Sequence, residues 1–172
     1  MGLVVIVGAV LFLGSRNSSG SGVASGTKAP LFTLTSTDGS KVSLAGYRGQ
    51  NVLLYFNEGV GCDACFYQTM ELQKDASELQ ANDVTLVPIV ANPADQVASE
   101  LARFGITTPY LIDEGGHVSS AYGMLGKGMH ADLPGHGFVF IDSSGRIRWE
   151  KEYPSMYASA AEIMSAIRPY LG

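Results

Sequence analysis

The sequence predicts an α/β protein in which helices flank a central mixed β-sheet. Short apolar runs have the length of buried strands, segments with helical periodicity lie between them, and a strand pair followed by a helix closes the chain. The 172 residues are enough to bury a core, and 46% hydrophobic with 16% charged residues is ordinary for a globular domain. With a net charge of −5 and no block of Lys or Arg, a nucleic-acid-binding function is not indicated.

Residues 1–27 are expected to lie apart from the folded domain, which we place at residues 28–172. The apolar run at 3–13 has the length of a signal-peptide core and is shorter than the roughly 20 residues that span a bilayer. The first charged side chain, Arg16, follows this run, so a signal or anchor and the end of a longer transmembrane segment both stay open. A Ser/Gly-rich tether follows. The pattern favours an extracytoplasmic protein that is membrane-anchored or secreted.

The first half of the domain is expected to form a hairpin, a buried strand and a helix. Residues 31–44 predict the hairpin, because Asp38-Gly39 separates two strand-like segments. Residues 52–56 are continuously apolar, which is typical of a strand buried on both faces of a parallel sheet. A helix should begin near Cys62, with a buried face that repeats every three or four residues and with Gln68 on its solvent side.

The second half is expected to alternate strands and helices. Residues 84–91 form another apolar strand, in which Pro88 predicts a bulge or a strand end. A helix should start at Pro93 and stop at Gly105. The remaining elements are a short strand at 110–112, a short helix at 117–122, a hairpin from 138–141 and 147–149, and a helix at 158–170.

The two cysteines of the chain, Cys62 and Cys65, lie where a buried strand gives way to a helix. The start of a helix presents unpaired N–H groups and a partial positive charge, and both stabilise a thiolate. Cys62 is nearest the helix end and is expected to attack. Cys65 falls one turn later on the buried side and would resolve the mixed disulfide.

Two other roles for a close cysteine pair are weaker. Structural zinc needs four ligands, and a second cysteine pair is missing from the sequence. An inert staple would enclose only two residues, and so small a loop adds little stability. A redox-active dithiol is therefore favoured, and no cofactor is expected.

From residue 26 to about 171 the chain resembles the redoxins, the alkyl hydroperoxide reductase/thiol-specific antioxidant (AhpC/TSA) family. The resemblance rests on a pattern spread over the domain, and its later part lies in PYLIDEGGHVSSAYGM and GFVFIDSSGRIRW. The opening part of the pattern comprises Gly26, Ala29, Pro30, Phe32, Leu34, Asp38, Gly39, Leu44, Arg48 and Gly49. The resemblance implies a thioredoxin fold with an N-terminal β-hairpin extension.

The site departs from the peroxidase version of that family. The family's Pro-x-x-x-Thr-x-x-Cys pattern becomes Glu58, Cys62 and Cys65, and its arginine place holds His136. The donors that polarise a peroxide are thus replaced, which favours dithiol exchange over a thiol peroxidase that uses Cys65. The related thioredoxins place a cis-proline against the dithiol at about the position of His136. Pro134 is two residues earlier and could take that role if a bulge intervenes.

Glu58 and His136 are candidates to support the dithiol. Glu58 could accept a proton from Cys65 or be a solvated loop carboxylate, and His136 could shuttle protons or order its loop. His130 and Met129 raise a further alternative, a redoxin that binds copper or another soft metal, because imidazole, thioether and thiolate suit Cu(I).

The sequence therefore predicts a thiol–disulfide oxidoreductase that exchanges disulfides through Cys62-Asp63-Ala64-Cys65, tethered to the outer face of a membrane. Its expected partners are protein thiols and disulfides together with an electron donor or acceptor protein. A thiol peroxidase and a soft-metal-binding redoxin are the alternatives.

Overall fold

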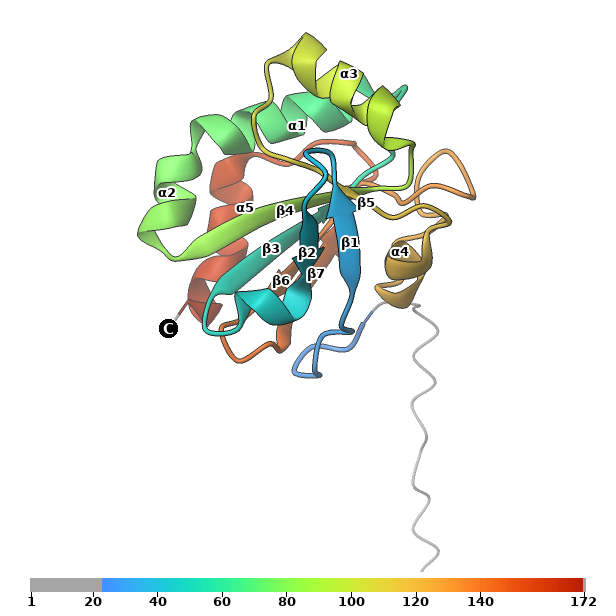
Figure 1. Cartoon of the computed structure of the whole chain (residues 1–172). Coiled ribbons are helices and arrows are strands. Elements are labelled where there is room, and N and C mark those ends of the chain that lie inside the picture. The colour runs from blue at the N-terminus through green and yellow to red at the C-terminus, as the bar shows by residue number, and fades with distance from the viewer. Residues whose placement is uncertain (1–22, 172) are drawn as a thin grey trace, which may run out of the picture.

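The computed structural model describes residues 23–171, and its core is one mixed seven-stranded sheet in the order β2-β1-β5-β4-β3-β6-β7 (Figure 1). The strands are β1 (Thr33–Ser36), β2 (Lys41–Ser43), β3 (Asn51–Phe56), β4 (Val84–Val90), β5 (Leu111–Ile112), β6 (Gly137–Ile141) and β7 (Ile147–Glu152). The helices are α1 (Asp63–Lys74), α2 (Ala76–Ala81), α3 (Ala94–Phe104), α4 (His117–Ala121) and α5 (Ala160–Ile167), with short 3₁₀ turns at Leu44–Tyr47 and Arg168–Tyr170. The predicted α/β thioredoxin fold with its N-terminal hairpin is confirmed.

Strand β3 is the centre of the fold and is buried along its whole length. It pairs in parallel with β4 and antiparallel with β6, so it contributes side chains to both faces of the sheet. Val52, Leu54 and Phe56 join the core on the face that carries α4 and the N-terminal segment. Leu53 and Tyr55 point to the opposite face, where they join the core that α5 covers. The polar hydroxyl of Tyr55 is thereby carried into the interior.

Local sequence signals account for several element boundaries. The hairpin forms around Asp38-Gly39 as predicted, with β1 and β2 paired antiparallel. Helix α3 ends at Gly105, whose φ of 65° is the left-handed conformation that favours glycine at a helix C-terminus. The helix that begins after Cys62 is divided in two, because Asp75 (φ −92°, ψ 16°) departs from helical geometry between α1 and α2.

The expectation of a bulge or strand end at Pro88 is wrong. Pro88 lies inside β4 opposite Tyr55, and the β3–β4 register runs through it without a shift. The Ile89 carbonyl accepts from Asn57 on the β3 side, so the backbone of the preceding Pro88 faces β5. Strand β5 pairs with β4 only at Ile89 and Val90. The N–H that proline lacks is therefore not needed by the ladder.

The predicted apolar segment at 3–13 lies outside the described residues. Within 23–171, no helix combines the length and apolar character that a membrane crossing requires.

Candidate active site

The site begins where β3 ends and the chain turns into α1. In this turn Gly59 has a φ of 71°, and a Cβ there would meet the Asn92 side-chain oxygen at 2.1 Å, so the turn requires glycine. Cys62 is the N-cap of α1, and its Sγ accepts a hydrogen bond from the backbone N–H of Cys65 at 3.3 Å. The thiol position thus faces the unpaired amides of the helix start.

Cys62 and Cys65 form a disulfide with a Cα–Cα distance of 5.4 Å. The two cysteines are not equivalent, because Cys62 retains 6% of its surface exposed and Cys65 retains none. Cys62 is therefore the more exposed member of the pair.

His136 is the side chain that contacts Cys65 from the other side. It directly precedes β6, and the pairing of Gly137 with Phe56 brings it to the end of β3 where the dithiol begins. Its Nδ1 lies 3.8 Å from Cys65 Sγ. Burial lowers the pKa of His136 from 6.5 to about 4, so the imidazole is neutral at neutral pH.

Two buried polar residues, Tyr55 and Gln68, complete this arrangement, and neither was among the site residues predicted from the sequence. The Tyr55 hydroxyl donates to the Cys65 carbonyl at 3.1 Å and lies 3.2 Å from His136 Nδ1. Burial raises the pKa of Tyr55 well above its ordinary value, so the hydroxyl keeps its proton. The sequence did contain a signal for Tyr55. A tyrosine in a strand that is expected to be buried on both faces needs a hydrogen-bond partner for its hydroxyl.

Gln68 was expected on the solvent side of its helix, and that expectation is wrong. It is fully buried, and its Oε1 accepts from the Ala158 backbone N–H at 2.8 Å and lies 3.4 Å from His136 Nε2. The segment before α5 covers this side of α1. A contact 90 residues away in sequence leaves no trace in the periodicity of the helix itself.

Glu58 is neither a solvated loop residue nor hydrogen-bonded to a cysteine in the described residues. Its carboxylate is 1% exposed, and Oε1 accepts from the backbone N–H groups of Met129 and His130. His130 Nδ1 lies 3.6 Å from the other carboxylate oxygen. Glu58 therefore anchors the loop that carries Met129 and His130.

The other candidate residues lie in the same loop region. Pro134 is buried in an isolated antiparallel bridge with Leu125, and no peptide bond between 23 and 171 is cis. Met129 and His130 are exposed at the surface. Among the described residues, no group of three or more His, Cys, Asp or Glu side chains is placed to hold a metal ion.

A cavity of about 280 Å³ leads to this site. His136 lies on its wall, so the cavity gives access to the side chain that contacts Cys65. Its other lining residues come from two flanking segments, and they are Lys127, Gly128, Met129, Glu152, Tyr153, Pro154 and Met156.

Known proteins resemble this chain in sequence. The profile of the AhpC/TSA family matches residues 25–150. A Mycobacterium tuberculosis protein assigned as a peroxiredoxin is 32% identical over 126 residues, which cover 71% of this chain and 80% of that protein. The thiol-disulfide oxidoreductase ResA of Geobacillus thermodenitrificans is also 32% identical, over 127 residues that cover 73% of this chain and 68% of ResA.

Solved structures agree on the fold. A Bacteroides thetaiotaomicron protein assigned as a protein disulfide isomerase superposes with a TM-score of 0.68 at 28% identity, covering 86% of this chain and 88% of its own. The reduced 2-Cys peroxiredoxin of Plasmodium vivax gives a TM-score of 0.74 at 24% identity, covering 85% of this chain and 95% of its own. The chain is thus similar both to peroxiredoxins and to thiol–disulfide oxidoreductases, and it is a thioredoxin-like redox protein.

Proposed function

The chain belongs to the AhpC/TSA family, and we propose that within it this protein is a thiol–disulfide oxidoreductase that works by exchange at Cys62 and Cys65. The observation that carries the proposal is the asymmetry of the pair. Cys62 caps α1 with part of its surface open, whereas Cys65 is fully buried one turn later against His136. Exchange needs one accessible attacking thiol and one protected resolving thiol.

In the proposed reaction the Cys62 thiolate attacks a partner disulfide. A bond forms between Cys62 and one partner sulfur, and the second partner sulfur leaves with the electron pair as a thiolate. Cys65 then attacks Cys62 Sγ, gives up its proton and displaces the bound partner as a thiol. The partner disulfide is reduced to two thiols while Cys62 and Cys65 are oxidised to the disulfide seen in the structure. The reverse sequence oxidises a partner dithiol.

Trapping of the intermediate tests this assignment. In Cys65→Ser the resolving thiol is gone, so a disulfide-bonded protein such as insulin should stay linked to Cys62, and mass spectrometry should find the adduct on that residue. The matched Cys62→Ser variant should form no such adduct under the same conditions. Adducts at Cys65 in Cys62→Ser, formed as fast as those at Cys62, would contradict the division of labour.

Thiol peroxidase activity at Cys65 is the second candidate, because relatives of this chain include peroxiredoxins and an alkyl hydroperoxide reductase. The geometry is less suited to it, since Cys65 is fully buried and no threonine hydroxyl precedes it at the family's position. Peroxide added to the reduced Cys62→Ser variant decides the point. Stoichiometric sulfenic acid at Cys65, formed within seconds, would favour the peroxidase.

We also propose an extracytoplasmic, membrane-tethered location, on the support of the apolar run and the Ser/Gly-rich segment in residues 1–27. Cell fractionation compares the full chain with a form that starts at residue 23. The full chain should sediment with membranes and the shortened form should not, and equal distribution of the two would contradict the proposal.

A further inference from the structure

The buried amide of Gln68 has only one orientation that the surrounding donors allow. The Ala158 backbone N–H points at the Gln68 side chain from 2.8 Å and can only donate, so the atom facing it must be the carbonyl oxygen. The reverse orientation would place the side-chain NH2 against the Ala158 N–H, so that two donors face each other in the interior. The observed orientation leaves only the Gln68 amide nitrogen without a partner among the described residues. Gln68 Oε1 is therefore fixed by a segment outside its own helix.

That fixed oxygen favours the tautomer of His136 in which Nε2 carries the proton. Gln68 Oε1 lies 3.4 Å from His136 Nε2 and can only accept, so this contact is a hydrogen bond only when Nε2 is protonated. In a neutral imidazole the other nitrogen then holds a free lone pair. That nitrogen, Nδ1, is the one that faces Cys65 Sγ at 3.8 Å.

Tyr55 leaves this lone pair available. Its single hydroxyl proton is donated to the Cys65 carbonyl at 3.1 Å. The hydroxyl oxygen lies 3.2 Å from Nδ1 and 3.4 Å from Nε2, and it can accept from the protonated Nε2. The hydroxyl fixes the backbone of Cys65 and the face of the imidazole at the same time. The ring of His136 packs edge-on against Tyr55 and Phe138, which further limits its rotation.

We propose that His136 is a catalytic residue that accepts the Cys65 thiol proton through Nδ1 during resolution, and that Gln68 is the positioning residue that keeps Nδ1 unprotonated for this purpose. This deepens the exchange proposed above and rests on it. In the step, the Cys65 S–H bond breaks and Nδ1 takes the proton. The sulfur electron pair forms the bond to Cys62, and the partner sulfur leaves as a thiolate that is protonated by the imidazolium or by water.

The basicity of His136 depends on the state of the dithiol. Its pKa of about 4 belongs to the disulfide form, in which burial acts and no anion faces Nδ1. A thiolate that forms 3.8 Å away stabilises the imidazolium, so the base strengthens as Cys65 loses its proton. The titratable groups around His136 are Tyr55 on β3 and Cys65 on α1, together with Lys127, Glu152 and Tyr153 across the cavity.

The first test is the tautomer itself. Long-range proton–nitrogen NMR spectra of the ¹⁵N-labelled disulfide form at pH 7 distinguish the two ring nitrogens, and the spectrum of His136→Phe identifies the signals of His136. We expect a protonated Nε2 and an unprotonated Nδ1. A protonated Nδ1 would overturn the proposal whatever the activity of the protein.

The second test separates the two chemical steps. Reduced protein mixed with Ellman's reagent should release one coloured thiolate when Cys62 attacks and a second when Cys65 resolves. His136→Phe should leave the first phase within about twofold and slow the second by about 100-fold, the lower range for loss of a general base. His117→Asn, which changes an exposed histidine on α4, is the matched control and should alter neither phase.

Two variants of Gln68 test its role as a positioning residue. Gln68→Met removes the acceptor and should slow the second phase about tenfold while mixing the tautomers of His136. Gln68→Glu keeps acceptors for Ala158 and Nε2, so it should restore much of that rate. Its negative charge should raise the pKa of His136 and move the pH profile of the second phase upward.

The outcomes distinguish the two proposals. A missing first phase in the wild type would reject the exchange reaction itself. A normal first phase with a second phase unchanged in His136→Phe would reject the role of His136 alone. Equal pH profiles for wild type and Gln68→Glu would reject the role of Gln68.

Discussion

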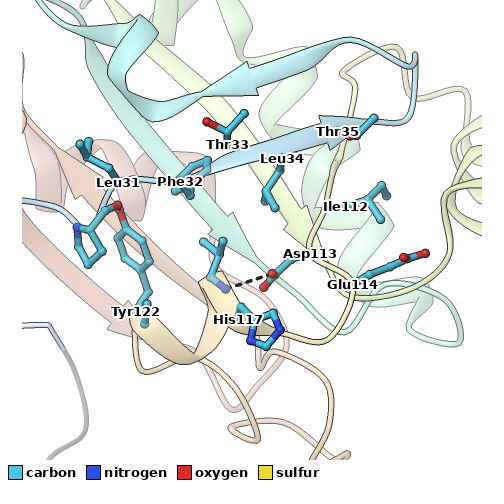
Figure 2. Close-up of a pocket in the computed structure, with 13 residues that line it drawn as sticks. Leu31, Phe32, Thr33, Leu34, Thr35, Ile112, Asp113, Glu114, His117 and Tyr122 are labelled. Atoms are coloured by element: carbon cyan, nitrogen blue, oxygen red, sulfur yellow. Dashed lines mark hydrogen bonds between the residues drawn. The ribbon is translucent and has the colours of Figure 1, made fainter.

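Two hollows on this protein differ in how fully the hydrogen bonds of their buried polar groups are satisfied. The larger, about 500 Å³, is an open groove between β1 and α4 (Figure 2). Its buried acid, Asp113, accepts from the backbone N–H groups of Val118 and Ser119 and from the Ser119 hydroxyl. The smaller, about 280 Å³, reaches His136, whose Nδ1 faces the Cys65 sulfur of the proposed site. The larger volume therefore belongs to the hollow whose buried acid is already hydrogen-bonded, and the smaller one leads to the proposed site.

The buried carboxylates and the buried imidazole of this protein have different roles. Asp113 and Glu58 each bind backbone amides, so both hold a local segment in place. In the proposed arrangement, the neighbours of His136 hold the ring and leave one nitrogen free to accept a proton. Substitutions at the groove should therefore change stability, and substitutions at the dithiol should change chemistry.

The largest effect is expected at Cys62. Cys62→Ser should reduce turnover of a disulfide substrate by at least about a thousandfold, because the serine hydroxyl is a far weaker nucleophile than the thiolate. Turnover of insulin with dithiothreitol as electron source measures this. Residual turnover within tenfold of the wild type would place the attacking thiol elsewhere.

The pH dependence of stability should report the burial of His136. Its pKa is about 4 in the folded protein and near 6.5 when unfolded, so between these values the unfolded state binds more protons. The contribution of neutral, buried His136 to the free energy of unfolding is fully present above about pH 6.5. It is lost as the pH falls toward 4, by as much as about 3 kcal/mol. Urea unfolding of the disulfide form at pH 7 and pH 4.5 measures it.

The variant His136→Phe isolates that contribution, since its other titrating groups are unchanged. Its unfolding free energy should fall less between the two pH values than that of the wild type. Identical losses in both proteins would show that the histidine is not buried as a neutral group.

At the groove, Asp113→Ala should lower the free energy of unfolding by about 2 kcal/mol. The change leaves the first amides of α4 without their charged acceptor, and hydrogen bonds to charged groups contribute about 1.5–3 kcal/mol. The rate of disulfide exchange per folded molecule should stay the same. A large fall in that rate, with little loss of stability, would give the groove a role in the reaction.

The smallest effect is expected for Glu58→Gln. The amide oxygen can still accept from Met129 and His130, so the unfolding free energy should change by less than about 1 kcal/mol. Glu58→Ala leaves both amides without that acceptor and should lose about 2 kcal/mol. Similar unfolding midpoints for the two variants in urea would show that Glu58 does not anchor the loop.

Elements whose signals are local could be predicted from the sequence. The Asp38-Gly39 turn, the apolar run of β3 and the stop at Gly105 depend on backbone preferences and burial within a few residues. The dithiol at the start of a helix is equally local, because the motif and its flanking elements are contiguous. These features identify the fold, and they indicate the atoms that we propose to react.

Tertiary structure alone decided how the site is supported. Gln68 is buried because the segment before α5 covers its side of α1, and His136 meets Cys65 because β6 pairs with β3 in one particular register. Pro88 fits a central strand because its backbone faces β5, and β5 pairs with β4 only at the next two residues, Ile89 and Val90. Each of these outcomes joins residues far apart in the chain. Helical or strand periodicity shows which side chains share a face, but only the packed fold shows what covers that face.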